Sequence, residues 1–276
     1  MFNRRSIALA ALSVALWASA AAAHDQSKYP DMYGQWVRAH QRSQWDPSKA
    51  RGLAQQAPLT PEYQAIFEEN LKALRESRFD VDPQLRCMPA GVPRMMIAYE
   101  PLEFIVTAAV TYIRLDHLSE LRRIYTDGRD WPATVQPAFE GYSIGQWLDE
   151  NGDGRYDVLV VETRHFKGPR YLDADGLPLH KNNRTVVKER IYLDKAKPDL
   201  MHAEITTIDD AFTRPWTVTR DYIRERNPVW PEYLCTEANN HVFIGKERYF
   251  KSVDGHLMPI RKDQPPPDLK YFNQPR

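Results

Sequence analysis

The stretch DENGDGRYD, residues 149–157, concentrates side chains that carry oxygen atoms and could bind a metal ion. Calcium takes about six to eight oxygen ligands, and a turning loop supplies them most easily from alternate positions. Gly154 stands sixth, where such a loop has to turn sharply, so the stretch fits the D-x-[DN]-x-[DN]-G pattern of calcium loops. We therefore expect a structural calcium ion as cofactor. Its oxygen ligands would come from Asp149, Asn151, Asp153, the backbone carbonyl of Arg155, and Asp157.

The flanks of this loop distinguish it from an EF-hand. The twelfth position is Val160 rather than Glu, and the flanking runs GYSIGQWL and VLVVET are typical of strands. The loop resembles the DxNGDGxxD calcium loops between strands of FG-GAP and integrin-type propeller blades, although a single copy does not imply a propeller. The alternative is a solvated hairpin turn, in which four carboxylates within nine residues would repel one another unless a cation or water screened them.

A second group of residues could transfer protons. The stretch RRIYTDGR, residues 122–129, places Tyr125 and Asp127 among arginines, and His117 and His165 lie near predicted strand ends. Such a cluster at the rim of a barrel could orient a carboxylate or carbonyl group and move a proton, with a histidine as acid or base. These four side chains are the candidate catalytic residues. The alternative is that the arginines only pair with acids on neighbouring strands.

Several familiar catalytic patterns are missing from the sequence. It contains no nucleophile elbow, P-loop, dinucleotide fingerprint, HExxH motif or zinc-ligand spacing. Hydrolysis by a known serine or zinc machinery is therefore unsupported, and no organic cofactor is expected. Lys plus Arg equals Asp plus Glu at 37 each, so the charge balance does not favour nucleic acid as a partner.

Candidate ligand-binding residues recur at the spacing of strands. Alternate side chains of a strand share one face, so TRPWTVTRDYIR, residues 213–224, would align arginines with Trp and Tyr. Such a face could line a barrel mouth and hold an anionic or aromatic ligand by guanidinium hydrogen bonds and cation–π contacts. The alternative is a solvated face whose long stems cover aromatic rings. The candidate set is Arg122, Arg123, Tyr125, Lys188, Arg190, Trp216, Arg220 and Tyr222.

The elements that would position these residues are mainly strands. LTPEYQAIFEENLKAL predicts one amphipathic helix over about residues 61–76, with Thr60 as its N-cap and Pro61 in its first turn. After Met96 the hydrophobic period changes to two, and runs rich in Val, Ile, Thr and Tyr follow one another between Asp-Gly turns. Sequential strands with short connections favour an all-β fold, an antiparallel up-and-down barrel, with a two-sheet β-sandwich as the alternative.

The chain divides into three parts. Residues 1–23 combine two arginines, an apolar run and an alanine-rich end, which is typical of a secretory signal peptide. We therefore expect a periplasmic or secreted protein, exported by the general or the twin-arginine route. Residues 24–95 should wrap the surface and include the helix, and residues 96–276 should form the β-barrel domain with a C-terminal tail. No later run is apolar enough to cross a bilayer.

Two cysteines, Cys87 and Cys235, lie far apart in the mature chain. In an oxidising compartment such a pair most often forms one disulfide. Two free thiols or a redox pair are the alternatives, although the sequence has no CxxC spacing.

Two further resemblances bear on the fold. Gly34-Gln35-Trp36 resembles the GxW motif that opens lipocalin barrels, where the Trp plugs one end, and it implies a lipocalin- or calycin-like barrel. The motifs CMPAGVPRMM, RRIYTDGR, GYSIGQW and TRPWTVTRDY resemble a group of uncharacterised exported bacterial proteins. That resemblance runs from about Cys87 to Cys235 and implies export and an all-β fold, but it carries no catalytic residues. The chain departs from the group's commoner form, in which the hairpin after GYSIG is shorter and lacks the acidic insertion.

Together these features predict an exported, lipocalin-like protein that binds a small, largely apolar molecule with an acidic or carbonyl group, because such barrels can enclose one ligand. One alternative is a cofactor-independent isomerase, cyclase or lyase that uses acid–base residues at the barrel mouth. Another is an interaction protein of the cell envelope.

Overall fold

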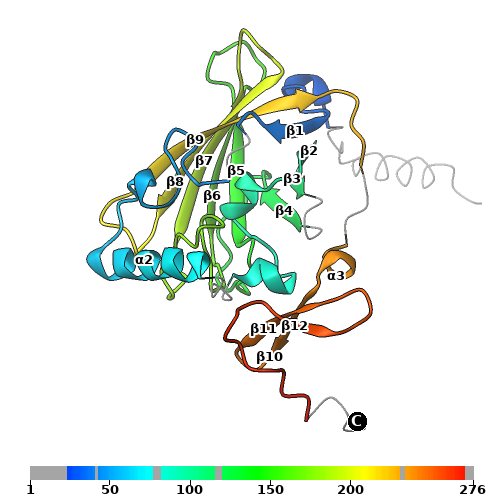
Figure 1. Cartoon of the computed structure of the whole chain (residues 1–276). Coiled ribbons are helices and arrows are strands. Elements are labelled where there is room, and N and C mark those ends of the chain that lie inside the picture. Colours follow the sequence, from blue (N-terminus) through cyan, green and yellow to red (C-terminus); the bar gives the residue numbers. More distant parts are fainter. Residues whose placement is uncertain (1–23, 41–42, 77–81, 116–119, 231–233, 271–276) are drawn as a thin grey trace, which may run out of the picture.

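The computed structural model describes most of the chain after the predicted signal peptide (Figure 1). The predicted signal peptide, residues 1–23, and the candidate catalytic residue His117 lie outside the described residues. The described ranges are 24–40, 43–76, 82–115, 120–230 and 234–270.

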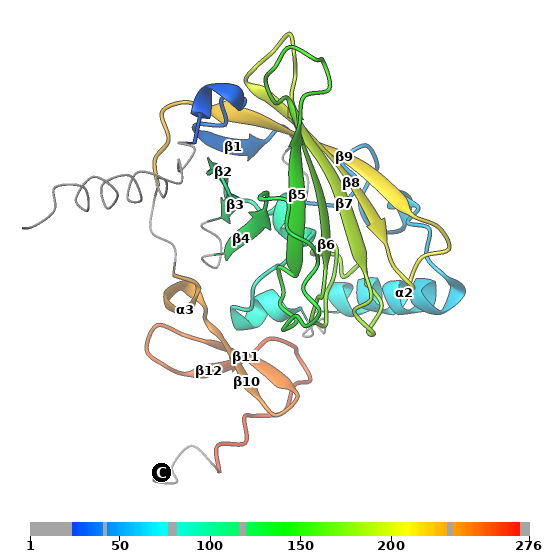
Figure 2. The same ribbon diagram turned by 180° about the vertical axis from the view of Figure 1, so that it is seen from behind.

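Nine strands close into a barrel in the order in which they follow along the chain (Figures 1 and 2). They are β1 (Gln35–Arg38), β2 (Leu102–Val106), β3 (Val110–Leu115), β4 (Glu120–Tyr125), β5 (Tyr142–Leu148), β6 (Val158–Arg164), β7 (Val186–Leu193), β8 (Leu200–Ile208) and β9 (Trp216–Glu225). The predicted all-β barrel is therefore confirmed, rather than the two-sheet sandwich. The period of two is clearest in β9, where buried and less buried residues alternate along the whole strand.

One step departs from a simple meander, because β4 and β5 are parallel. They overlap at the last residues of β4 and the first of β5, where Ile124 pairs with Ser143 and Tyr125 with Ile144. Because β5 begins beside the end of β4, the loop 126–141 can connect these two parallel strands without a helical crossover. The remaining strand pairs of the barrel are antiparallel.

The first strand comes from a part of the chain for which the sequence analysis predicted no strand. β1 lies between β9 and β2 and closes the barrel. Its Trp36, the aromatic residue of the GxW stretch, is fully buried and donates its indole N–H to the carbonyl of Met32 at 3.1 Å. The guanidinium of Arg224 stacks on the Trp36 ring at 4.5 Å. The segment 24–95 therefore contributes one strand to the barrel.

The predicted helix is confirmed as α2 (Pro61–Arg75). The Thr60 hydroxyl accepts a hydrogen bond from the backbone N–H of Tyr63, and Pro61 occupies the first turn, where its missing N–H costs nothing. Tyr63 and Phe67 on one face of α2 join the hydrophobic core. The helix crosses the lower ends of the long strands β6 to β9 (Figures 1 and 2).

The barrel interior is filled by the protein's own side chains. Trp45, Met95 and Met96 are almost completely buried and belong to the same core cluster as the inward-facing residues of the strands. Met95 and Met96 come from the short 3-10 helix η4 (Arg94–Ile97), and the hydroxyl of Tyr222 on β9 donates to the Met96 carbonyl at 2.6 Å. Segments that precede β2 in the sequence thus occupy space that a lipocalin-like barrel would offer to a ligand.

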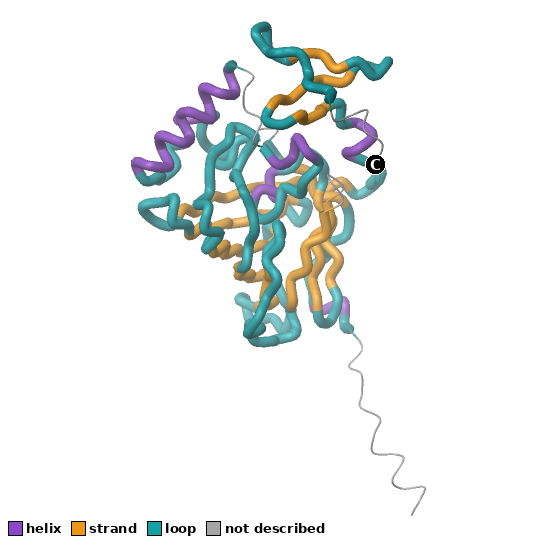
Figure 3. The backbone as a smooth tube through the Cα atoms, turned by 90° about the horizontal axis from the view of Figure 1, so that it is seen from below, coloured by secondary structure: helices purple, strands orange, loops and turns teal. Residues whose placement is uncertain are grey.

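The C-terminal tail forms a small sheet of its own, with β10 (His241–Ile244), β11 (Glu247–Lys251) and β12 (Leu257–Pro259), preceded by α3 (Cys235–Ala238). Seen from below, this sheet stands apart from the barrel strands (Figure 3).

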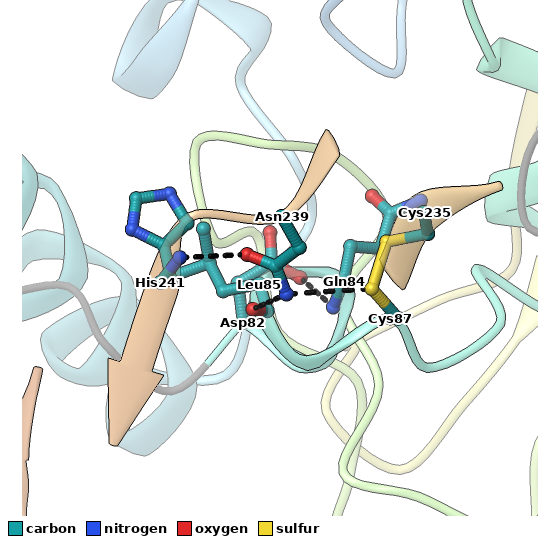
Figure 4. The surroundings of a disulfide bond; sticks show 7 residues. All are labelled: Asp82, Gln84, Leu85, Cys87, Cys235, Asn239 and His241. Atoms are coloured by element: carbon teal, nitrogen blue, oxygen red, sulfur yellow. Dashed lines mark hydrogen bonds between the residues drawn. A yellow bond between two sulfur atoms is a disulfide. The ribbon is translucent and has the colours of Figure 1, made fainter. Parts of the chain in front are cut away.

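The predicted disulfide between Cys87 and Cys235 is confirmed (Figure 4). Beside it, the side-chain amide of Asn239 donates to the Leu85 carbonyl at 3.1 Å and to the Cys87 sulfur at 3.3 Å. The small sheet is therefore tied covalently to the 3-10 helix η3 (Pro83–Arg86) that precedes the barrel strand β2. Among the described residues, no helix is long and apolar enough to cross a bilayer.

Candidate ligand-binding site on the outer face of the barrel

The outer face of β5 to β9 carries three rows of side chains, which the strand register aligns across neighbouring strands. The first row is Ile144, Glu162, Lys188, Thr206 and Thr217. The second row is Gln146, Val160, Arg190, Glu204 and Thr219. The third row is Leu148, Val158, Tyr192, His202 and Asp221. Because neighbouring strands lie only about 4.8 Å apart, side chains within one row can contact each other.

A hollow of about 880 Å³ lies over the first two rows. One end is aromatic, since Tyr29 and Tyr156 lie 4.9 Å apart between ring centroids. Beneath Tyr29, Trp147 is buried and donates its indole N–H to Thr111 at 2.9 Å. The other end is bordered by Arg129 in the loop that follows β4. The floor consists of Ile144, Gln146, Val160, Glu162, Lys188, Arg190, Glu204 and Thr206. A ligand with an apolar ring and a polar group would meet matching surfaces here.

A second hollow, of about 990 Å³, adjoins the first over the third row. It lies between the loop 149–157 and the hairpin 194–199, which rise from the sheet at the top of Figure 1. Both hollows are lined by Tyr156, Arg190 and Glu204. These three residues therefore mark the boundary between the hollows.

Ion pairs and hydrogen bonds link the charged residues of the floor. Lys188 lies 3.5 Å from the Glu162 carboxylate. The Tyr192 hydroxyl donates to Glu204 at 2.8 Å, and Arg190 lies 3.8 Å from the second oxygen of that carboxylate. Burial, reinforced by the neighbouring Glu204, raises the pKa of Tyr192 to about 12. Tyr192 therefore acts as a hydrogen-bond donor at neutral pH, and it helps to hold Glu204 in place.

His202 in the third row is a titratable residue of the site that the sequence analysis did not single out. Its Nδ1 lies 2.7 Å from Asp221 on β9, and its Nε2 lies 3.4 Å from Asp194 in the hairpin. Although partial burial lowers the pKa of His202, the hydrogen bonds to Asp221 and Asp194 outweigh it, and the net pKa is raised. Strand alternation from Glu204 could have placed His202 on this face, but its pairing with Asp221 depends on the β8–β9 register.

The candidate residues Tyr125 and Asp127 lie together at the end of β4. The Arg129 guanidinium stacks on the Tyr125 ring at 3.8 Å and donates to the Asp127 carboxylate, with Nε–Oδ1 at 2.8 Å and Nη2–Oδ2 at 2.6 Å. This hydrogen bonding holds the pKa of Asp127 below its usual value. At neutral pH Asp127 is therefore an ionised partner of Arg129, which does not suit it as a proton donor.

His165 is connected to this cluster only through aromatic rings. Tyr125 stacks on Tyr142 at 5.0 Å, Tyr142 lies 6.0 Å from Trp131, and Trp131 lies 6.1 Å from His165. Within the described ranges, no hydrogen bond joins His165 to Tyr125 or to Asp127. The structure thus brings three of the four catalytic candidates into one neighbourhood, as an aromatic strip rather than an acid–base relay.

The predicted ligand-binding residues divide between the two faces of the barrel wall. Arg122 points into the interior and its neighbour Arg123 points outward, because successive residues of a strand face opposite ways. The side chains of Trp216, Arg220 and Tyr222 also lie in the interior. Lys188 and Arg190 line the outer hollow, and Tyr125 lies on the outer face beneath Arg129.

The interior arginines are held by other groups of the protein. The Arg122 guanidinium pairs with the Glu189 carboxylate, and the two side chains are 1% and 0% exposed. Arg122 also donates to the hydroxyls of Ser143 at 3.2 Å and Thr163 at 2.8 Å. Arg220 donates to the Trp45 carbonyl at 2.6 Å. Because these guanidinium groups bind other parts of the protein, their role is structural rather than ligand-binding.

The loop 149–157 is the hairpin between β5 and β6, as expected. The Asp149 carboxylate accepts hydrogen bonds from the backbone N–H groups of Gly152 at 2.7 Å and Gly154 at 2.9 Å. Asp157 accepts one from the N–H of Glu150 at 2.9 Å. The carboxylates are thus turned toward the loop's own amides, and no group of three or more metal-ligating side chains is arranged for a metal within the described part of the chain. Carboxylate and amide oxygens are nevertheless the donors that calcium prefers.

No protein-family model matches the chain, and no curated protein matches it.

Proposed function

We propose that this chain is an exported β-barrel protein that binds a small, largely apolar molecule with an acidic or carbonyl group. The observation that carries the proposal is the hollow of about 880 Å³, which joins an aromatic end to a floor with charged groups. Tyr29 and Tyr156 would pack against the apolar part of the ligand. The cationic groups of Lys188 and Arg190 would receive the acidic or carbonyl group.

The placement of the ligand differs from that in a lipocalin. Trp45, Met95 and Met96 fill the interior, whereas both hollows lie outside on the sheet. The barrel would therefore act as a rigid support for a site built on its outer wall, where the strand register sets the distances between side chains.

Export and calcium binding are two further parts of the proposal. A signal-like start, residues 1–23, supports export, and the disulfide suits an oxidising compartment. We propose that the loop 149–157 binds a structural calcium ion through the oxygens of Asp149, Asn151, Asp153, Arg155 and Asp157. The bound ion would screen the mutual repulsion of the loop carboxylates and hold the hairpin in one conformation.

A second candidate function is cofactor-independent acid–base catalysis. The observation in its favour is His202 in the second hollow, held by Asp221 through one ring nitrogen and facing Asp194 with the other. A carboxylate that orients an imidazole is a common element of acid–base sites. The raised pKa favours the protonated form of His202, which can donate a proton.

The binding proposal can be tested by native mass spectrometry on protein purified gently from its own host. The expected result is a mass above that of the chain and its calcium. Val160→Trp would fill the floor of the first hollow and should abolish the extra mass. Thr219→Trp is the matched control, because Thr219 lies in the same row but lines neither hollow. An extra mass that persists in Val160→Trp would refute the location of the site.

A further inference from the structure

Arg190 occupies the centre of the outer face. It stands in the second row between Val160 on β6 and Glu204 on β8, and it lines both hollows. An arginine fork is the side chain best suited to hold a carboxylate through two parallel hydrogen bonds. Arg190 is therefore the natural anion receptor of the site.

The Arg190 fork already holds a carboxylate of the same chain. Its Nη1 donates to Glu150 Oε1 at 2.8 Å and its Nη2 donates to Glu150 Oε2 at 3.0 Å, which is a bidentate pair. Its cross-strand neighbour Glu204 is farther away, at 3.8 Å from Nε. Glu150 belongs to the loop 149–157 and not to the sheet. The fork thus binds a carboxylate that reaches it from outside the strand ladder.

We propose that the Glu150 carboxylate is an internal substitute for the ligand's carboxylate, so that Glu150 and the ligand compete for the Arg190 fork. This inference rests on the proposed function, and it narrows the ligand class to carboxylates with an apolar ring or chain. The ring would lie toward Tyr29 and Tyr156. Its carboxylate would replace that of Glu150 at Arg190.

Exchange of the two carboxylates is favoured by the exposure of the pair. The side chains of Arg190 and Glu150 are 41% and 40% exposed, so water and salt screen their attraction. A ligand carboxylate would regain both hydrogen bonds that the fork loses when Glu150 leaves.

Other charged groups lie around the Arg190 fork, and most of them have partners of their own. Lys188 lies two residues away on the same face of β7 and is paired with Glu162. Glu204 is held by the Tyr192 hydroxyl. Lys195, on the hairpin 194–199, lines the second hollow and adds positive charge there.

The test compares a charged probe with a neutral one of the same shape. Binding of 2-naphthoate and of 2-naphthylmethanol is measured by calorimetry on the full mature protein. Glu150→Gln should bind naphthoate up to about 5-fold more tightly, since an exposed ion pair contributes at most about that factor. Arg190→Gln should weaken naphthoate binding. Neither substitution should change the affinity for the neutral alcohol by more than about 2-fold.

Glu103→Gln is the matched control for the loss of one negative charge. Glu103 pairs with Arg114 at 3.4 Å on β2 and β3, away from both hollows, so its loss should leave naphthoate binding unchanged. Equal naphthoate affinity in Glu150→Gln and the wild type, or an equal gain for the alcohol, would overturn the competition alone. If the wild type binds neither probe, the proposed function and this inference both fail.

Discussion

Arg122 offers the sharpest test of how this barrel is held together. Its side chain and that of Glu189 are 1% and 0% exposed, and the pair joins β4 to β7 across the interior. Ser143 on β5 and Thr163 on β6 accept further hydrogen bonds from the same guanidinium. These contacts span the β4–β5 step, where the two strands overlap for only two residue pairs.

Arg122→Met would leave the Glu189 carboxylate buried without a partner. Removing one member of a buried ion pair costs about 3–5 kcal/mol, because the remaining charge is neither hydrated nor compensated. Replacing both members by apolar side chains of similar volume is often neutral or stabilising. We therefore expect Arg122→Met to lose about 3–5 kcal/mol and the double variant Arg122→Met/Glu189→Met to regain most of that loss.

The assay is urea unfolding at neutral pH with the disulfide intact, followed by tryptophan fluorescence and circular dichroism. Arg123→Met is the matched control, since Arg123 is exposed on the opposite face of β4 and should change stability by no more than about 0.5 kcal/mol. A cost below about 1 kcal/mol for Arg122→Met would refute the reasoning. The reasoning would also be refuted if the double variant lost as much stability as the two single variants together.

Three further predictions concern the calcium loop, His202 and the disulfide. The protein should melt at a lower temperature in EDTA than in millimolar calcium, whereas identical melting curves would contradict calcium binding by residues 149–157. The pKa of His202 is raised above its unfolded value of about 6.5, so its stabilisation is complete below that pH and is lost as the pH rises through the folded pKa. The difference in urea midpoint between wild type and His202→Gln should therefore be larger at pH 5.5 than at pH 8.5, and a constant difference would count against the aspartate contacts. Replacing Cys87 and Cys235 by Ser should lower the free energy of unfolding by about 5 kcal/mol through loop closure, and an unchanged urea midpoint would show that the bond adds no stability.

Local patterns were sufficient for the helix α2 and for the barrel strands β2 to β9. Thr60 and Pro61 predicted where α2 begins, because a cap and a proline act within one helical turn. The alternation in residues 213–224 predicted a strand with one face of Trp, Arg and Tyr, and β9 has that face. Such signals depend on neighbours along the chain, so they can be read without the fold.

Which face of each barrel strand is buried could be determined only from the tertiary structure. The face of β9 that carries Arg220 and Tyr222 was predicted as a possible ligand surface, yet it is buried, because the segments that contain Trp45 and Met96 offer backbone carbonyls to it. These acceptors lie more than a hundred residues away in sequence, and no pattern within the strand indicates them. The parallel step between β4 and β5 and the recruitment of β1 into the barrel have the same origin in long-range pairing.

The sequence by itself determined the strand-rich barrel, the helix, the cysteine pair and the hairpin at residues 149–157. Only the tertiary structure showed that the hollows lie on the outer wall and that Arg190 meets Glu150, His202 meets Asp221, and Arg122 meets Glu189. The physical reason is that the period of a strand sorts side chains into two faces. Which face is covered, and which residues become partners on it, depends on the register and on chain segments from elsewhere.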